Sequence, residues 1–132
     1  MSQEVRRLVI ERTLRQADFT AFAALSGDDN PIHVDADFAA RTRFGRTVAH
    51  GVLLCSILRG LAARLVPGGR QVAEAVTFLA PTYADEPMRF EAALAADDGR
   101  MVRLRLGVTR IEDGTLTCAG EATLRRGKEG AP

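Results

Sequence analysis

The sequence predicts an α+β fold in which a curled antiparallel sheet of about five strands wraps around one long buried helix. The stretch from Gly51 to Leu65 is apolar around nearly its whole circumference, which is typical of a helix buried by its surroundings. After Gly69 the apolar residues alternate with polar ones, as in strands with one covered face. A length of 132 residues suits one compact domain, so residues 1–132 are expected to form a single domain.

Short elements precede the long helix. A first strand is predicted over residues 7–14, where Leu8, Val9 and Ile10 follow one another. Asp18 is expected to cap a short helix over residues 21–26, and Gly27 is a suitable residue to end it.

Two loops flank a second short helix. Residues 27–32 (GDDNPI) are dense in turn formers, and their proline favours an extended backbone before it, so a rigid loop is predicted. Asp35 is expected to cap a helix over residues 36–41, and the glycine-containing stretch 44–47 forms the next loop.

Four strands are expected after the long helix, which itself ends at Pro67 and the two following glycines. Their ranges are 72–78, 89–94, 101–109 and 116–124, with hairpin turns at 97–99 and 112–114. Glu74 lies on the apolar side of its strand, which suggests an edge or an interface. Residues 126–132 are expected to form a frayed tail.

The overall charge gives no sign of a polymeric partner. The formal net charge is +1, so no large field of one sign would attract nucleic acid or a membrane surface. No secretory signal is recognisable, and the longest apolar run (48–58) is too short to span a bilayer, so a cytoplasmic location is expected.

Cys55 and Cys118 lie far apart without neighbouring ligands, so no metal site is predicted.

The residues best suited to chemistry are Asp28 and His33, with Gly51 downstream. The proline-stiffened turn between Asp28 and His33 can bring a carboxylate and an imidazole to one water molecule, and either group could act as the base. Gly51 begins the long helix, where backbone N–H groups lack intrahelical acceptors and favour an anionic oxygen.

Two motifs carry a family resemblance. The stretch Ser26 to His33 (SGDDNPIH) and the stretch Phe44 to Gly51 (FGRTVAHG) resemble the MaoC-like (R)-specific enoyl-CoA hydratases, with the similarity running from about Phe19 to Leu65. The resemblance implies a hot-dog fold and the reversible hydration of trans-2-enoyl-CoA to (R)-3-hydroxyacyl-CoA.

The resemblance also implies roles for single residues. Asp28 and His33 match the catalytic pair, and Gly51 matches the residue whose amide faces the thioester carbonyl. Asn30 matches the motif asparagine, which fixes the loop, and Asn30 is also assigned to substrate binding. His50 is assigned to substrate binding from its place just before Gly51, with a structural role at the helix start as the alternative. No cofactor is implied, because coenzyme A is part of the substrate.

Several alternatives stay open from the residues alone. A 3-hydroxyacyl-ACP dehydratase, a hot-dog acyl-CoA thioesterase and a non-catalytic acyl-CoA-binding module are the rival functions. Arg41, Arg43 and Arg46 could meet the CoA phosphates or form a solvated face, and Ser56 is interpreted as a packing residue. A five-stranded sheet leaves edges that a second copy could cover, so a homodimer or a dimer of dimers is expected.

Overall fold

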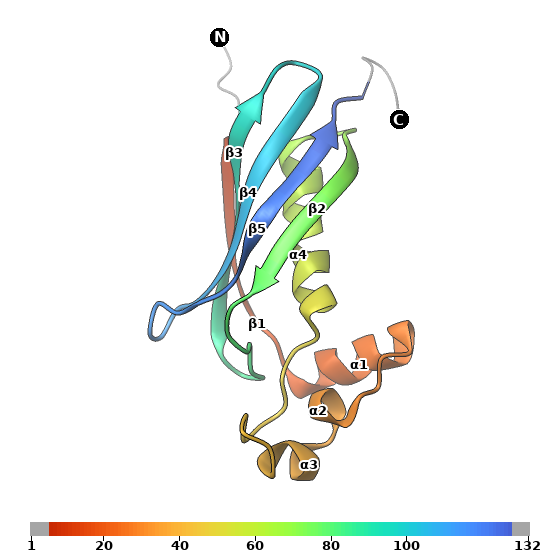
Figure 1. Cartoon of the computed structure of the whole chain (residues 1–132), viewed down its shortest axis with the longest axis vertical. Coiled ribbons are helices and arrows are strands. Elements are labelled where there is room, and N and C mark those ends of the chain that lie inside the picture. Colours follow the sequence, from red (N-terminus) through yellow and green to blue (C-terminus); the bar gives the residue numbers. More distant parts are fainter. Residues whose placement is uncertain (1–5, 128–132) are drawn as a thin grey trace.

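A computed structural model describes residues 6–127 and shows one antiparallel sheet bent around a long helix (Figure 1). In that range the sheet has five strands in the order β1-β3-β4-β5-β2, and three short helices gather at one end of it. The predicted α+β class is confirmed. The elements in chain order are β1 Arg7–Thr13, α1 Gln16–Ser26, α2 Pro31–Val34, α3 Ala36–Ala40, α4 Gly51–Leu65, β2 Arg70–Phe78, β3 Pro87–Asp97, β4 Met101–Arg110 and β5 Leu116–Arg125.

The core lies between the sheet and one face of α4. The alternation predicted for β4 is confirmed, because its buried residues are every second one, from Val102 to Val108. Phe90 on β3 lies opposite Val108 and is also buried. Five residues of α4 complete this core, namely Leu54, Leu58, Leu61, Ala62 and Leu65.

The predicted bounds of α4 are confirmed, but its expected burial on all sides is wrong. Val52 is 66% exposed, and Ser56, Gly60 and Ala63 on the same side are exposed as well. The reason is that a single sheet covers only one side of a helix. This side of α4, made of small residues and Val52, is therefore left without a partner in the described part of the chain.

The N-terminal helices differ from the prediction in two places. Helix α1 begins at Gln16, and Asp18 lies inside its first turn, where its Oδ2 accepts a hydrogen bond from the Arg15 amide at 2.8 Å. Residues 31–34 form a one-turn helix instead of a loop, because proline suits a first helical position and Asn30 Oδ1 accepts from the Ile32 amide at 3.2 Å. Gly27 ends α1 with a φ of 84°, as expected.

The cap predicted for α3 is confirmed, since Asp35 Oδ1 accepts a hydrogen bond from the Phe38 amide at 3.0 Å. The predicted frayed tail begins too early, because the Arg126 amide donates to the Arg100 carbonyl at 2.8 Å and its guanidinium pairs with Asp97. Residues 128–132 of that predicted tail lie outside the described residues.

Along 6–127, no helix has the length and apolar character needed to cross a membrane.

Strand β2 is an edge strand, which explains Glu74 on its apolar side. Glu74 lies opposite Ala122 of β5, and the other side of β2 has no neighbouring strand in the described chain. Val72, Phe78 and Leu79 are large apolar residues that stay exposed along or just after this edge.

The pairing of β2 with β5 depends on a glycine. A Cβ atom added at Gly120 would lie 2.1 Å from the Ala75 carbonyl oxygen, which is backbone and cannot give way.

Gly120→Ala should therefore lower the free energy of unfolding by about 2 kcal/mol or more, measured by urea denaturation. Gly107→Ala is the matched control, because its added Cβ would meet only Leu116 at an ordinary 3.7 Å. Equal stability of the two variants would contradict this account of the β2 to β5 contact.

Candidate active site

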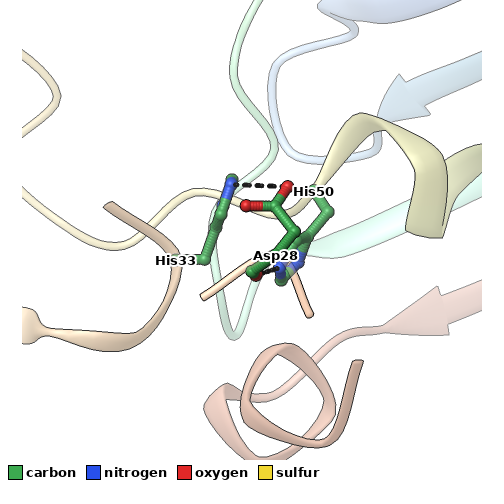
Figure 2. Close-up of side chains that lie close together, drawn as sticks. All are labelled: Asp28, His33 and His50. Atoms are coloured by element: carbon green, nitrogen blue, oxygen red, sulfur yellow. Dashed lines mark hydrogen bonds and ion pairs between the residues drawn. The ribbon is translucent and has the colours of Figure 1, made fainter. Parts of the chain in front are cut away.

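The structure brings Asp28 and His33 together, as the sequence predicts. Asp28 lies in the loop between α1 and α2, and His33 lies on α2. Figure 2 shows the carboxylate of Asp28 turned towards the imidazole of His33, with Oδ2 and Nε2 separated by 3.8 Å. A water molecule can hydrogen-bond both atoms at that separation, because each bond needs about 2.8 Å. The Asp28 side chain is 58% exposed, so water reaches the pair freely in the single chain.

The orientation of His33 is fixed by a backbone carbonyl. Its Nδ1 lies 2.7 Å from the oxygen of Val48, and a carbonyl can only accept. Nδ1 therefore carries a proton and donates it to Val48. In the neutral ring, Nε2 then holds the lone pair that faces Asp28, so the imidazole is ready to accept a proton at that atom.

His50 lies behind His33. Its ring stacks on that of His33 with centroids 3.8 Å apart and planes inclined by 21°, and the residue is only 2% exposed. Its Nε2 donates to the backbone carbonyl of Asp28 at 2.9 Å. The contact expected between His50 and the substrate would therefore have to be made by a side chain that is almost completely buried.

One atom each of Asp28, His33 and His50 lie within 4.8 Å of one another, which is close enough to consider a metal ion. The stacking argues for another use. The lone pair of an imidazole nitrogen lies in the ring plane, and the planes of two stacked rings 3.8 Å apart hardly converge, so the two lone pairs are not directed at one ion. The arrangement suits acid and base chemistry better than shared coordination.

Asn30 has the loop-fixing place that the resemblance implies. Its side chain is the cap of α2, described above, so Asn30 sets where the helix that carries His33 begins. Gln16 supports the same helix, because its Nε2 donates to the His33 carbonyl at 2.9 Å while its Oε1 accepts from Thr47 at 2.6 Å. Gln16, Thr47 and Val48 are not among the site residues predicted from the sequence. Val48 could not be predicted, because it acts through its backbone carbonyl, which every residue has.

Gly51 is the first residue of α4, so its amide lies at the positive end of a 15-residue helix. A Cβ atom at this position would lie 2.5 Å from the ring of Phe78, so a larger residue would require that half-exposed ring to move. A cavity of about 660 Å³ adjoins this helix end and is mainly apolar. Its lining includes Arg43, Phe44, Val48, Gly51, Val52 and Phe78.

The cavity reaches Gly51 and Val48 but is not lined by Asp28 or His33. Val48 connects the two places, since it lines the cavity and holds the His33 ring. Of the three arginines in the local cluster, Arg43 lines the cavity, whereas Arg46 donates to the Ala84 carbonyl at 2.6 Å. Ser56 Oγ donates to the Leu53 carbonyl of its own helix at 2.7 Å, as expected, but Ser56 is exposed in the described chain and so does not have the packing role expected of it.

Comparison with known proteins places this geometry in a family. The model of the MaoC like domain matches residues 1–118. The chain is 36% identical over 115 residues to an (R)-specific enoyl-CoA hydratase of Aeromonas caviae, covering 83% of this chain and 84% of the relative. It is 31% identical to a mitochondrial 3-hydroxyacyl-[acyl-carrier-protein] dehydratase of Arabidopsis thaliana, covering 85% and 70%.

A solved structure agrees with these sequence relatives. The (R)-hydratase from A. caviae involved in PHA biosynthesis matches with a TM-score of 0.87 and 30% identity, covering 96% of this chain and 98% of that one. The hot-dog fold implied by the motifs is confirmed by this match. The chain therefore belongs to the family of MaoC-like domains, as the SGDDNPIH and FGRTVAHG motifs predict.

Proposed function

We propose that this protein is an enoyl-CoA hydratase that adds water reversibly to a trans-2-enoyl-CoA and forms the (R)-3-hydroxyacyl-CoA. The observation that carries the proposal is the Asp28 carboxylate 3.8 Å from the lone-pair nitrogen of His33. The family relatives named (R)-specific enoyl-CoA hydratase support the substrate class and the stereochemistry. The reaction needs no cofactor.

The proposed reaction uses the two side chains around one water. As the water oxygen bonds to the β-carbon, one water proton passes to the Asp28 and His33 pair, and the α-carbon receives a proton in exchange. His33 Nε2 is the preferred proton acceptor, because its Nδ1 is tied to Val48. The C=C bond is lost and both groups return to their starting protonation states.

The thioester oxygen gains negative charge as the β-carbon is attacked. We assign its stabilisation to the amide of Gly51 at the start of α4, where the helix dipole favours an anion. The adjoining apolar cavity of about 660 Å³ suits an acyl group or a pantetheine arm. Arg43 on its wall is a candidate contact for the CoA phosphates.

Removing either member of the pair should abolish most of the activity. Asp28→Asn and His33→Ala are each expected to lower kcat by about a hundredfold or more, the usual size of one acid or base contribution. The measurement follows loss of the conjugated enoyl chromophore with a panel of trans-enoyl-CoA esters, and circular dichroism checks folding. Asp29→Asn is the matched control, since Asp29 is exposed next to the pair and should keep its activity. A loss of only severalfold in both variants would refute the assignment.

An acyl-carrier-protein dehydratase would run the same chemistry in reverse on another thioester carrier, and one relative carries that name. Comparing turnover of matched CoA and carrier-protein thioesters separates the two. Higher kcat/KM with the CoA ester supports the hydratase.

A thioesterase would direct water at the carbonyl carbon and release free thiol from saturated acyl-CoA. A thiol reagent detects this, and the two cysteines of the protein contribute little background. Burial raises the pKa of Cys118 to about 11 and raises that of Cys55 as well. Affinity for intact acyl-CoA without any turnover would instead indicate a binding module.

We also propose that the protein acts as a homodimer that associates along β2. The other edge strand, β1, is protected by charged residues at Arg7, Glu11 and Arg12. Strand β2 exposes Val72, and Phe78 and Leu79 follow on the same edge. An exposed apolar edge of this kind is a surface that soluble proteins cover.

A charge placed on β2 should therefore separate the subunits. Val72→Lys is expected to shift the protein from dimer to monomer in sedimentation at micromolar concentration, because Val72 is 50% exposed on the proposed interface. Val9→Lys is the control on the opposite edge, where Val9 is 39% exposed. A monomeric wild type, or dissociation of both variants alike, would contradict the β2 interface.

A further inference from the structure

His50 has no part in the proton transfers described above, yet it touches both residues that do. We propose that His50 is a positioning residue, which anchors the loop carrying Asp28 and holds the plane of the His33 ring. The inference rests on the proposed function, because it assigns a task within that site. It does not require His50 to meet the substrate.

The first support is the anchoring of the loop. Residues 27–30 are exposed, and their other hydrogen bonds are local, such as the one from the Asp28 amide to Ser26 Oγ at 3.1 Å. Within residues 6–127, the bond from His50 Nε2 to the Asp28 carbonyl at 2.9 Å is the one that ties this loop to a segment distant in sequence. Without it, only local contacts would fix the carboxylate relative to α2, such as the bond from the Asn30 amide to Asp28 Oδ1 at 3.5 Å.

The second support is the stacking on His33. The bond from Nδ1 to Val48 fixes one point of the His33 ring but leaves its plane free to tilt. The face of His50, 3.8 Å away and nearly parallel, removes that freedom. Figure 2 shows His50 beside both Asp28 and His33, so one side chain sets the position of one partner and the orientation of the other.

The third support is an unpaired atom. Because Nε2 donates to a carbonyl, the lone pair of neutral His50 lies on Nδ1, which is buried and has no hydrogen-bond partner among the described residues. Burying an acceptor unpaired is unfavourable, so the imidazole is a poor choice for packing alone. An apolar ring would fill the space at less cost but could not hold the Asp28 carbonyl.

Two substitutions separate the two tasks of His50. His50→Phe keeps a ring against His33 and loses the donor, whereas His50→Gln keeps an N–H donor and loses the ring. The matched control is Phe22→Leu, because Phe22 packs against His50 with ring centroids 4.9 Å apart but bonds neither Asp28 nor His33.

We expect His50→Phe to lower kcat by about tenfold to a hundredfold with little change in KM, since small displacements of reacting groups have effects of that size. Its pH profile of kcat/KM should change shape, because Asp28 and His33 no longer face each other as before. His50→Gln should lose less, and Phe22→Leu should lose stability while keeping kcat and the profile. A His50→Phe enzyme with wild-type kcat and an unchanged profile would overturn the inference.

Hydrogen exchange gives a readout that does not depend on activity. A peptide covering residues 27–30 should exchange faster in His50→Phe, or in His50→Gln if His50→Phe does not fold, than in Phe22→Leu at equal global stability. Unchanged exchange would also overturn the inference. Should the wild type hydrate no enoyl thioester, the proposed function fails, and the exchange comparison still decides whether His50 anchors the loop.

Discussion

The site depends on hydrogen bonds between two short segments, residues 28–33 and residues 48–50. The Val48 amide donates to the Ile32 carbonyl at 3.0 Å, His33 Nδ1 donates to the Val48 carbonyl at 2.7 Å, and His50 Nε2 donates to the Asp28 carbonyl at 2.9 Å. Residue 50 runs directly into α4. These bonds therefore hold an exposed, polar loop against the start of α4, and the other end of that helix is fixed in the core.

The segment at 48–50 is itself held from the sheet side. The Ala49 amide donates to the Thr82 carbonyl at 2.8 Å, and Val48 forms an isolated bridge with Tyr83. The α2 loop, the helix start and the connection after β2 thus meet at one place. A candidate pair carried by a loop and a one-turn helix needs such support, since catalytic geometry tolerates displacements of only about 0.5 Å.

Most of the fold and the residues of the site could be predicted because their signals are local. Gly51 and Pro67 mark the ends of α4, period-two patterns mark the strands, and the motif holds Asp28 and His33 at a spacing that its proline keeps short. The errors have a different origin. The half-exposed α4 shows that apolar composition does not reveal how many neighbours a helix has. Helix α2 has only four residues, too few for a periodic pattern, and its signals, Asn30 and Pro31, are equally typical of a turn.

The backbone contacts of the site were beyond prediction for a related reason. A carbonyl such as that of Val48 is present at every residue, so only the fold decides which one meets an imidazole. His50 was identifiable as a residue of interest, but its depth and its stacking partner depend on the packing of α1 and α2 against the start of α4.

Asp28 is the open side of the pair in the single chain, because its side chain is 58% exposed whereas that of His33 is 14% exposed. Hydration of a thioester benefits from a closed site, because electrostatic stabilisation weakens in bulk water. Val52, Phe78 and Leu79 are exposed apolar residues, and all three line the cavity beside Gly51. Two of these residues, Phe78 and Leu79, belong to the proposed β2 interface, so the surface that would drive association also flanks this cavity. Under the proposed dimer and the proposed function, assembly would also cover the site, and an isolated subunit would hold Asp28 and His33 in place yet leave a bound thioester open to water.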